Sequence, residues 1–225
     1  LVNSTSSQKL SLDTDFNFLL FGQITGNNPF NDRKNTFFAI KWLCETFKDD
    51  PDVGVVIKTN HGKNSKIDKT LTSRLLKNLL QEVKQGEYPK IYLLHGDLTE
   101  EEISDVYRDD TVKALLAPSR GEGYGLPLLE AAACELPVIA TNWSGHLDFL
   151  NKGKFIKLNY KLTPIHPSRV DNHIFVDGAC WAEVSEEDFN EDYEWCLNEP
   201  EKYPFGPDSN VKWAVWRLKG DTSPI

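Results

Sequence analysis

The segment from Val112 to Ala140 constrains the fold of this chain more than any other stretch. It begins with an apolar run, Val112 to Pro118, and passes through a turn that contains three glycines. An apolar, helix-like segment then starts at Leu126 or Pro127, and a second apolar run follows from Pro137 to Ala140. Short apolar runs on either side of a helix are typical of buried strands in a parallel sheet. The sequence therefore predicts a strand, a loop, a helix and a strand in that order.

The turn between the first of these strands and the helix has the composition of an anion-binding site. Gly121, Gly123 and Gly125 leave the backbone free to approach a ligand, and the amides and positive dipole end of the helix face the same place. Glu122 precedes the helix, and Glu130 lies one turn inside it. Because carboxylates repel phosphate but bind hydroxyl groups, this combination suits a nucleotide that carries sugars.

Two glutamates eight residues apart mean little alone, but the context of this pair is specific. The stretch GEGYGLPLLEAAACELPVIAT contains a glycine turn, a proline, a small-residue helix and a Pro-Val-Ile-Ala-Thr strand. In that order these parts resemble the paired-glutamate motif of retaining glycosyltransferases of the GT-B fold, family 4. The resemblance covers roughly Phe16 to Tyr203. It implies the C-terminal, donor-binding half of a GT-B enzyme, with the acceptor-binding half absent.

Apolar runs alternate with helical segments along the whole chain, which predicts an α/β fold. We expect a Rossmann-like, doubly wound parallel sheet with helices on both faces. The helices are expected from an Asp32 cap to about Phe47, along a leucine stripe from Leu71 to Val83, and after a Thr99 and Glu102 capping box. The expected strands are Phe16–Phe21, Val53–Asn60, Ile91–His95, Val112–Pro118, Pro137–Ala140 and Phe155–Tyr160.

The domain limits follow from changes in composition. Residues 1–15 are polar and are expected to form a lead-in or inter-domain linker, and residues 16–225 one nucleotide-sugar-binding domain. Within that domain, residues 161–178 are polar and contain prolines, so we expect a loop of unknown role. A helix is expected to start in Trp181–Glu183 and the acidic residues that follow. Trp213 and Trp216 are expected to pack back against the domain.

Three cations lie where a phosphate group would need them. Arg33 and Lys34 come at the start of a helix, where positive charge opposes the helix dipole and an anionic partner would offset the cost. Lys58 lies near the end of the second strand, and ligands of parallel sheets gather at the carboxyl ends of strands. The alternatives are ordinary ones: solvated surface charge for Arg33 and Lys34, and a lysine at the sheet edge for Lys58.

The resemblance to family 4 implies transfer of a sugar from a nucleoside diphosphate to an acceptor hydroxyl, with retention of the anomeric configuration. It implies catalytic roles for Arg33, Lys34 and Glu122. The two cations would bind the donor diphosphate, although here they are adjacent where the family spaces them, and Glu122 would contact the sugar. Glu130 would bind the ribose, and His95 would edge the base pocket if it is not simply structural. The donor-binding residues implied are Lys58, His95, Gly96, Gly123, Tyr124, Gly125, Leu126 and Glu130.

Composition limits the partners and the compartment. The net charge of −9 argues against nucleic acid or an anionic membrane as the main partner. The four cysteines have no paired spacing, and no apolar run reaches the length of a membrane span or a signal core, so a reduced cytoplasmic protein is expected. Peripheral membrane association would come only through the missing half. No metal or other cofactor is expected, because the nucleotide sugar is itself the substrate.

Two other functions remain open from the sequence. The chain contains no Met, which indicates a fragment or a processed chain, and a donor domain without its acceptor-binding domain is expected to be inactive in transfer. The main alternative is a non-catalytic nucleotide or nucleotide-sugar binding module that has no acceptor domain. A further alternative is an unrelated doubly wound enzyme such as an epimerase or a phosphorylase relative.

Overall fold

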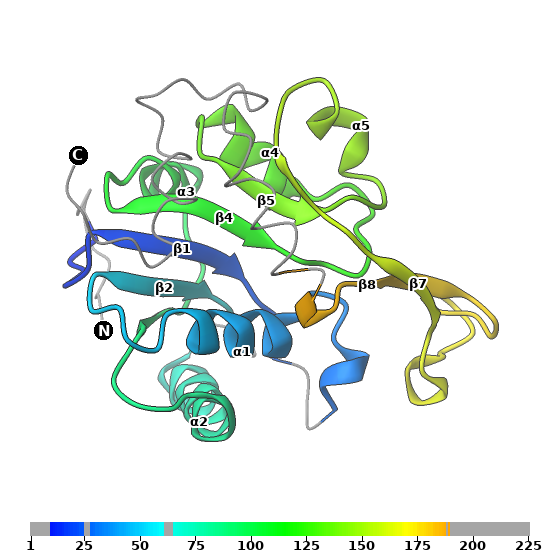
Figure 1. Cartoon of the computed structure of the whole chain (residues 1–225), viewed down its shortest axis with the longest axis horizontal. Helices are drawn as coiled ribbons and strands as arrows, with labels where there is room; N and C mark the ends of the chain where they lie inside the picture. The colour runs from blue at the N-terminus through cyan, green and yellow to red at the C-terminus, as the bar shows by residue number, and fades with distance from the viewer. Residues whose placement is uncertain (1–9, 25–27, 61–64, 188, 190–225) are drawn as a thin grey trace.

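The computed structural model describes residues 10–24, 28–60, 65–187 and 189. They form a parallel sheet with helices and a smaller two-stranded arm (Figure 1). The strands are β1 (Phe16–Phe21), β2 (Val53–Lys58), β3 (Lys90–Leu94), β4 (Val112–Ala117), β5 (Val138–Thr141), β6 (Ile156–Leu158), β7 (Lys161–Pro164) and β8 (Cys180–Glu183). The helices are α1 (Thr36–Thr46), α2 (Lys66–Val83), α3 (Glu100–Tyr107), α4 (Leu126–Ala133) and α5 (Leu147–Leu150), with 3-10 turns η1 (Pro29–Asn31) and η2 (Pro167–Arg169).

The main sheet confirms the predicted fold class. Its six strands are parallel throughout and lie in the order β3-β2-β1-β4-β5-β6. This is the strand order of the Rossmann fold, although no dinucleotide glycine fingerprint follows β1. The order reverses between β1 and β4, and in open α/β sheets this is the point where ligands bind.

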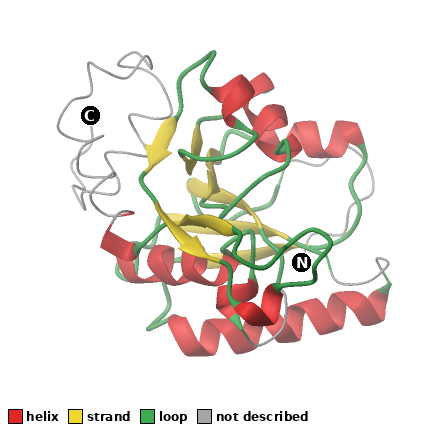
Figure 2. Ribbon diagram, turned by 90° about the vertical axis from the view of Figure 1, so that its right-hand side faces the viewer, coloured by secondary structure: helices red, strands yellow, loops and turns green. Residues whose placement is uncertain are grey.

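Two hydrophobic cores, one on each face, hold the helices against the sheet. Phe18 and Leu20 of β1 pack with residues of α1 and α2, whereas Leu19 between them packs with residues of α3 and α4. Val55 and Val56 of β2 divide between the two cores in the same way. Figure 2 shows the sheet lying between two layers of helices. Both faces being buried explains why the strands are continuous apolar runs in the sequence.

The start of α1 differs from the prediction that Asp32 is its cap. The N-cap is Asn35, whose backbone is left-handed with φ of 57°, and the helix begins at Thr36. The carboxylate of Asp32 nevertheless accepts hydrogen bonds from the amides of Lys34 at 2.8 Å and Thr36 at 2.5 Å. Asp32 therefore caps the helix through an extra turn of chain, which is where Arg33 and Lys34 lie.

The helices predicted along the leucine stripe and after the Thr99 and Glu102 capping box are confirmed as α2 and α3, with one error in the stripe of α2. Thr99 and Glu102 form the expected capping box at the start of α3. In α2, Leu76, Leu79 and Val83 are buried in the core, but Leu71 is 43% exposed. The buried position one residue further on is Thr72, whose hydroxyl donates to the carbonyl of Asp68 and is thereby satisfied. A hydrogen-bonded threonine thus takes the core position that the leucine pattern suggested.

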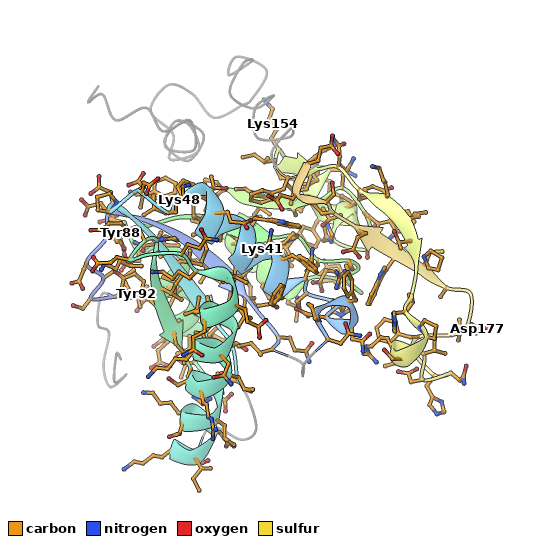
Figure 3. The ribbon with its side chains drawn as sticks, turned by 60° about the horizontal axis from the view of Figure 1, so that its bottom comes forward. Lys41, Lys48, Tyr88, Tyr92, Lys154 and Asp177 are labelled. Carbon is orange, nitrogen blue, oxygen red and sulfur yellow. The ribbon has the colours of Figure 1, made fainter. Side chains whose placement is uncertain are left out.

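The region predicted to be a loop of unknown role is part of a β arm. Residues 161–178 contain β7 and η2, and β7 pairs antiparallel with β8. Trp181–Glu183 lies in β8, so the prediction of a helix there is wrong; helical residues begin only at Glu186. The arm extends from the side of the sheet domain (Figure 1), and Asp177 marks its far end in Figure 3. Residues 1–9 of the predicted lead-in, Trp213 and Trp216 lie outside the described residues.

The described residues contain neither a membrane-spanning helix nor a cluster of potential metal ligands. In the described part of the chain, no helix combines the length and the apolar character that crossing a bilayer requires. Within the same ranges, no three His, Cys, Asp or Glu side chains come together as potential metal ligands. Cys44, Cys134 and Cys180 carry free thiols, and Cys196 lies outside the described residues.

Candidate functional site

The predicted site residues lie after the carboxyl ends of four adjacent strands. Arg33 and Lys34 follow β1, and Lys58 ends β2. His95 comes directly after β3, and Glu122 follows β4. Because β3, β2, β1 and β4 are neighbours in the sheet, these loops share one edge, on both sides of the point where the strand order reverses.

The structure brings Arg33, Lys34 and Glu122 together in one cluster. Lys34 Nζ lies 2.6 Å from Glu122 Oε1, and Arg33 Nη1 lies 2.8 Å from Glu122 Oε2. Arg33 also donates to the carbonyl of Gly121. The Glu122 side chain is 5% exposed, whereas those of Lys34 and Arg33 are 16% and 32% exposed. The cations therefore reach solvent, and the carboxylate lies beneath them.

The charges around Glu122 determine its protonation. Burial by itself would raise the pKa of Glu122, but the charges of Lys34 and Arg33 outweigh that effect and hold the pKa below its ordinary value of 4.5. The carboxylate is therefore ionised at neutral pH. The single negative charge of Glu122 neutralises only one of the two positive charges, so the cluster retains net positive charge for an anionic ligand.

A pH dependence of stability follows from the lowered pKa of Glu122. A carboxyl group with a depressed folded-state pKa stabilises the fold fully above 4.5, and this contribution is lost as the pH falls through the folded-state pKa. The difference in unfolding free energy between wild type and Glu122→Gln is therefore expected to shrink as the pH falls below 4.5. Urea unfolding of both proteins between pH 7 and pH 3 measures this difference. A difference in unfolding free energy that stays constant over this pH range would contradict the ion pairing. Glu45→Gln controls for the loss of one carboxylate that is paired with a lysine on the surface.

The glycine turn is braced by the loop that follows β5. Ser144 Oγ accepts from the Glu122 amide at 2.7 Å and donates to the Glu122 carbonyl, and the Gly145 amide donates to that carbonyl at 3.1 Å. A Cβ atom on Gly145 would lie 2.0 Å from the carbonyl oxygen of Gly123, so only glycine fits there. Gly125, with φ of 86°, is the N-cap of α4, as the turn prediction requires. The hydrogen bonds from Ser144 and Gly145 thus hold the backbone of Glu122 in place.

The other turn residues face solvent. Tyr124 is 49% exposed and Leu126 is 59% exposed, and Gly123 is also exposed. The ring of Tyr124 rests against Phe149 of α5, with ring centres 5.3 Å apart. The first turn of α4, which begins at Leu126, therefore opens toward solvent next to the cation cluster.

Glu130 is held by a tyrosine that the sequence did not identify. The hydroxyl of Tyr107, at the end of α3, donates to Glu130 Oε2 at 2.9 Å. The Tyr107 ring stacks on Phe21, the last residue of β1, with ring centres 5.9 Å apart. Burial and the carboxylate of Glu130 raise the pKa of Tyr107, so its hydroxyl remains a donor. Glu130 is half-buried, and no hydrogen bond from the described residues reaches its Oε1.

Lys58, His95 and Gly96 form a second group one strand further along the sheet. Lys58 Nζ donates to the Gly96 carbonyl and, at 3.0 Å, to Asn60 Oδ1. Burial lowers the pKa of Lys58, and Asp97 partly offsets this. Burial also lowers the pKa of His95, with further contributions from Lys58 and Lys69, so its ring is neutral at pH 7. Its Nε2 is buried and has no partner among the described residues.

Sequence reasoning missed four residues that shape the site: Tyr107, Ser144, Gly145 and Arg120, whose guanidinium donates to the carbonyls of Pro29 and Asp32 next to Arg33. Their partners lie between 22 and 91 residues away along the chain, beyond any helical or strand period. The one available signal was position, because Arg120 opens the glycine turn and the Ser144-Gly145 pair lies in the loop that follows Thr141, the last residue of β5.

Comparison with known proteins gives a match to one protein-family model. Residues 30–203 match the family described as "Glycosyl transferases group 1". Among curated protein sequences, none matches significantly. The chain is similar to a solved C-terminal domain of a glycosyl transferase group 1 family protein from Francisella tularensis. The two are 18% identical with a TM-score of 0.48, over 93% of this chain and 88% of that one.

Two further solved structures are similar over most of this chain but are much longer. Sucrose-phosphate synthase from Thermosynechococcus elongatus is 18% identical with a TM-score of 0.49, over 92% of this chain and 41% of that one. The GtfA/B complex is 17% identical with a TM-score of 0.49, over 92% of this chain and 36% of that one. The chain thus spans less than half the length of these two similar proteins.

Proposed function

Because the chain belongs to the glycosyl transferases group 1 family, we propose that it is the donor-binding domain of a retaining glycosyltransferase of family 4. It binds a nucleoside diphosphate sugar, and the sugar, a hexose, is transferred to an acceptor hydroxyl with its anomeric configuration retained. The observation that carries the proposal is the pairing of Arg33 and Lys34 with Glu122, beside the glycine turn that begins α4.

In this proposal the cations act on the leaving group. Departure of the nucleoside diphosphate leaves negative charge on a phosphate oxygen. Arg33, Lys34 and the amides of the first turn of α4 stabilise this charge as it develops, and donors that are already in place do so without reorganisation. Glu122, just beneath the cations, contacts the hydroxyls of the transferred sugar together with the backbone of Gly123 to Leu126. No metal is required, since the net positive charge of the cluster takes its role.

The nucleoside extends from the cation cluster along the strand ends. Glu130, oriented by the hydrogen bond from Tyr107, binds the ribose hydroxyls. The group formed by Lys58, His95 and Gly96 borders the base, where the buried Nε2 of His95 lacks a partner among the described residues. A neutral histidine suits this position because it binds an uncharged base by hydrogen bonding.

The test of this assignment is Glu130→Ala, which is expected to weaken binding of a nucleoside diphosphate by about ten- to a hundredfold. A hydrogen bond to a charged group contributes about 1.5–3 kcal/mol, and 1.4 kcal/mol corresponds to about tenfold in affinity. Calorimetry with a nucleoside diphosphate and its 2′,3′-dideoxy analogue measures the effect. The analogue is expected to bind both proteins equally, because it lacks the hydroxyls that Glu130 contacts.

The matched control is Glu82→Ala, which removes an exposed carboxylate of α2 and is expected to leave affinity unchanged. Equal affinity of wild type and Glu130→Ala for the ribose ligand would contradict the assignment. So would an equal loss for the dideoxy analogue, since the carboxylate would then act on some other part of the ligand.

Transfer itself needs an acceptor-binding domain, in the same parent chain or in a partner. We place the protein in the cytoplasm, where nucleotide sugars are available, with any membrane contact made through the acceptor domain. The second candidate function is a non-catalytic nucleotide-sugar binding module. Slow hydrolysis of a bound nucleotide sugar by the chain, lost in Glu122→Gln, would support the transferase; tight binding with no turnover in the presence of the second domain would support the module.

A further inference from the structure

Arg120 is the largest side chain that is fully buried in the described structure, with no exposed surface. It lies two residues before Glu122, at the end of the segment that leads out of β4. Removing an arginine from water is costly unless its charge is paired and its donors are satisfied. A charge buried beside a ligand site therefore needs a specific arrangement of partners.

Arg120 uses four of its five N–H groups on partners from two other segments. Its Nε donates to Glu183 Oε2 at 2.7 Å and its Nη2 to Glu183 Oε1 at 2.5 Å, which is the paired geometry typical of arginine and carboxylate. Its Nη1 donates to the carbonyls of Pro29 at 2.8 Å and Asp32 at 2.7 Å. The guanidinium carbon also lies 5.1 Å from the centre of the Trp181 ring.

These contacts connect the segment after β4, the turn before α1 and strand β8. The turn is held at Asp32, the residue that precedes Arg33. Pro29 and Asp32 belong to the turn between β1 and α1, and Glu183 belongs to β8 of the arm. The main chain adds two bonds: the Arg120 amide donates to the Arg33 carbonyl at 2.8 Å, and the Ala182 amide donates to the Arg120 carbonyl at 2.9 Å. The backbone on both sides of the Asp32–Arg33 peptide is thus attached to Arg120.

We propose that Arg120 is a positioning residue of the donor site: its bonds to the Pro29 and Asp32 carbonyls and to Glu183 hold Arg33 and Lys34 where they meet Glu122 and the donor diphosphate. Glu183 makes the β7–β8 arm a structural part of this site, although the arm itself extends away from it (Figure 1). The effect on diphosphate binding rests on the proposed function. The positioning of Arg33 and Lys34 against Glu122 by Arg120 is independent of that function.

The competing explanation is that Arg120 and Glu183 only stabilise the fold. The double variant Arg120→Met, Glu183→Gln separates the two, because it removes both charges together and leaves neither unpaired. The control is Leu76→Ala, which opens a cavity in the core under α2 and destabilises the chain without touching the site. Should the double variant not fold, Arg120→Lys replaces it, since lysine keeps the charge but offers three donors at one point.

The deciding measurement is an NMR titration of the Glu122 carboxyl carbon. The polar groups near this carboxylate are Lys34 and Arg33 from the segment before α1, Ser119 from its own loop, and His146 at the start of α5. The pKa of Glu122 is expected to rise in the double variant, because displaced cations no longer offset burial, and to stay unchanged in Leu76→Ala. An unchanged pKa in the folded double variant would overturn the proposal.

The second measurement is the affinity for a nucleoside diphosphate relative to that for the free nucleoside. The double variant is expected to bind the diphosphate about tenfold more weakly or worse, with the nucleoside unaffected, because only the cation geometry has changed. A purely structural role predicts no change in this ratio, and that result would overturn the effect on diphosphate binding. If wild type bound no nucleotide, the proposed function would fail, and the titration of Glu122 would still decide whether Arg120 positions the cluster.

Discussion

Replacing Arg33 and Lys34 together by alanine is expected to weaken nucleoside diphosphate binding by about a hundredfold or more. Each cation can make a hydrogen bond to a charged phosphate oxygen, which contributes about 1.5–3 kcal/mol. Two such bonds contribute about 3–6 kcal/mol, which is about a hundredfold to ten-thousandfold in affinity. Both the variant and its reference should carry Glu122→Gln, so that no unpaired carboxylate is left beneath the site. Calorimetry at constant ionic strength measures the difference.

Lys41→Ala is the control for the loss of positive charge; it removes one cation, whereas the variant above removes two. Lys41 lies on α1 (Figure 3), close in sequence to the cluster, but its ammonium pairs with Glu45 and Glu186, each at 2.9 Å. Replacing Lys41 by alanine also makes the net charge more negative. It is expected to leave the affinity for the nucleoside diphosphate nearly unchanged, because exposed ion pairs contribute little free energy. Affinity within about threefold of the reference for the Arg33 and Lys34 variant would contradict the account, since a single lost charge-assisted bond exceeds that.

Gly145→Ala is expected to destabilise the protein and also to weaken diphosphate binding. Its Cβ would lie 2.0 Å from the Gly123 carbonyl oxygen and 3.0 Å from the Glu122 carbonyl oxygen. Both are backbone atoms, so the added carbon can be accommodated only by moving the glycine turn. Overpacking typically costs about 1–3 kcal/mol and sometimes more. In a chain of this size that corresponds to a fall in Tm of about 2–4 °C per kcal/mol, which calorimetric scanning measures.

Gly123→Ala is the stability control, because it adds the same methyl group to the other glycine of the Gly123–Gly145 contact. A Cβ on Gly123 would meet no atom within 4 Å, so its unfolding free energy is expected to change by less than about 0.5 kcal/mol. Equal stability of Gly145→Ala and Gly123→Ala would show that the close contact between the two loops does not exist in solution. The bracing of Glu122 by the loop after β5 would then be wrong as well.

The sequence predicted the sheet well because burial on both faces leaves a clear pattern. The main strands were found to within a few residues, since a strand covered on both sides must be an apolar run. The β7–β8 arm was missed because the apolar pattern that reveals buried strands is absent from β7. All four residues of β7 are exposed, so nothing in its composition distinguishes it from a polar loop. The error at Leu71 has a similar origin, because a hydrogen-bonded threonine can occupy a core position.

The candidate site was predictable only where its residues are close to a local signal. Glu122 and Glu130 belong to one motif, and Arg33 and Lys34 stood out because two cations precede a helix. The partners that orient these residues come from distant segments: Tyr107 lies 23 residues from Glu130, and Glu183 lies 63 residues from Arg120. Their roles follow from strand order and helix packing, which no local pattern records.

Binding of a nucleoside diphosphate by the cation cluster can be measured by calorimetric titration with UDP, GDP and ADP in turn, and with the corresponding nucleosides. The chain is expected to bind one of the three diphosphates saturably at one site and to bind its nucleoside much more weakly, because the cluster of Arg33, Lys34 and Glu122 acts on the phosphates. If a sample that unfolds cooperatively bound none of the three diphosphates, the cluster would not be a donor-binding site.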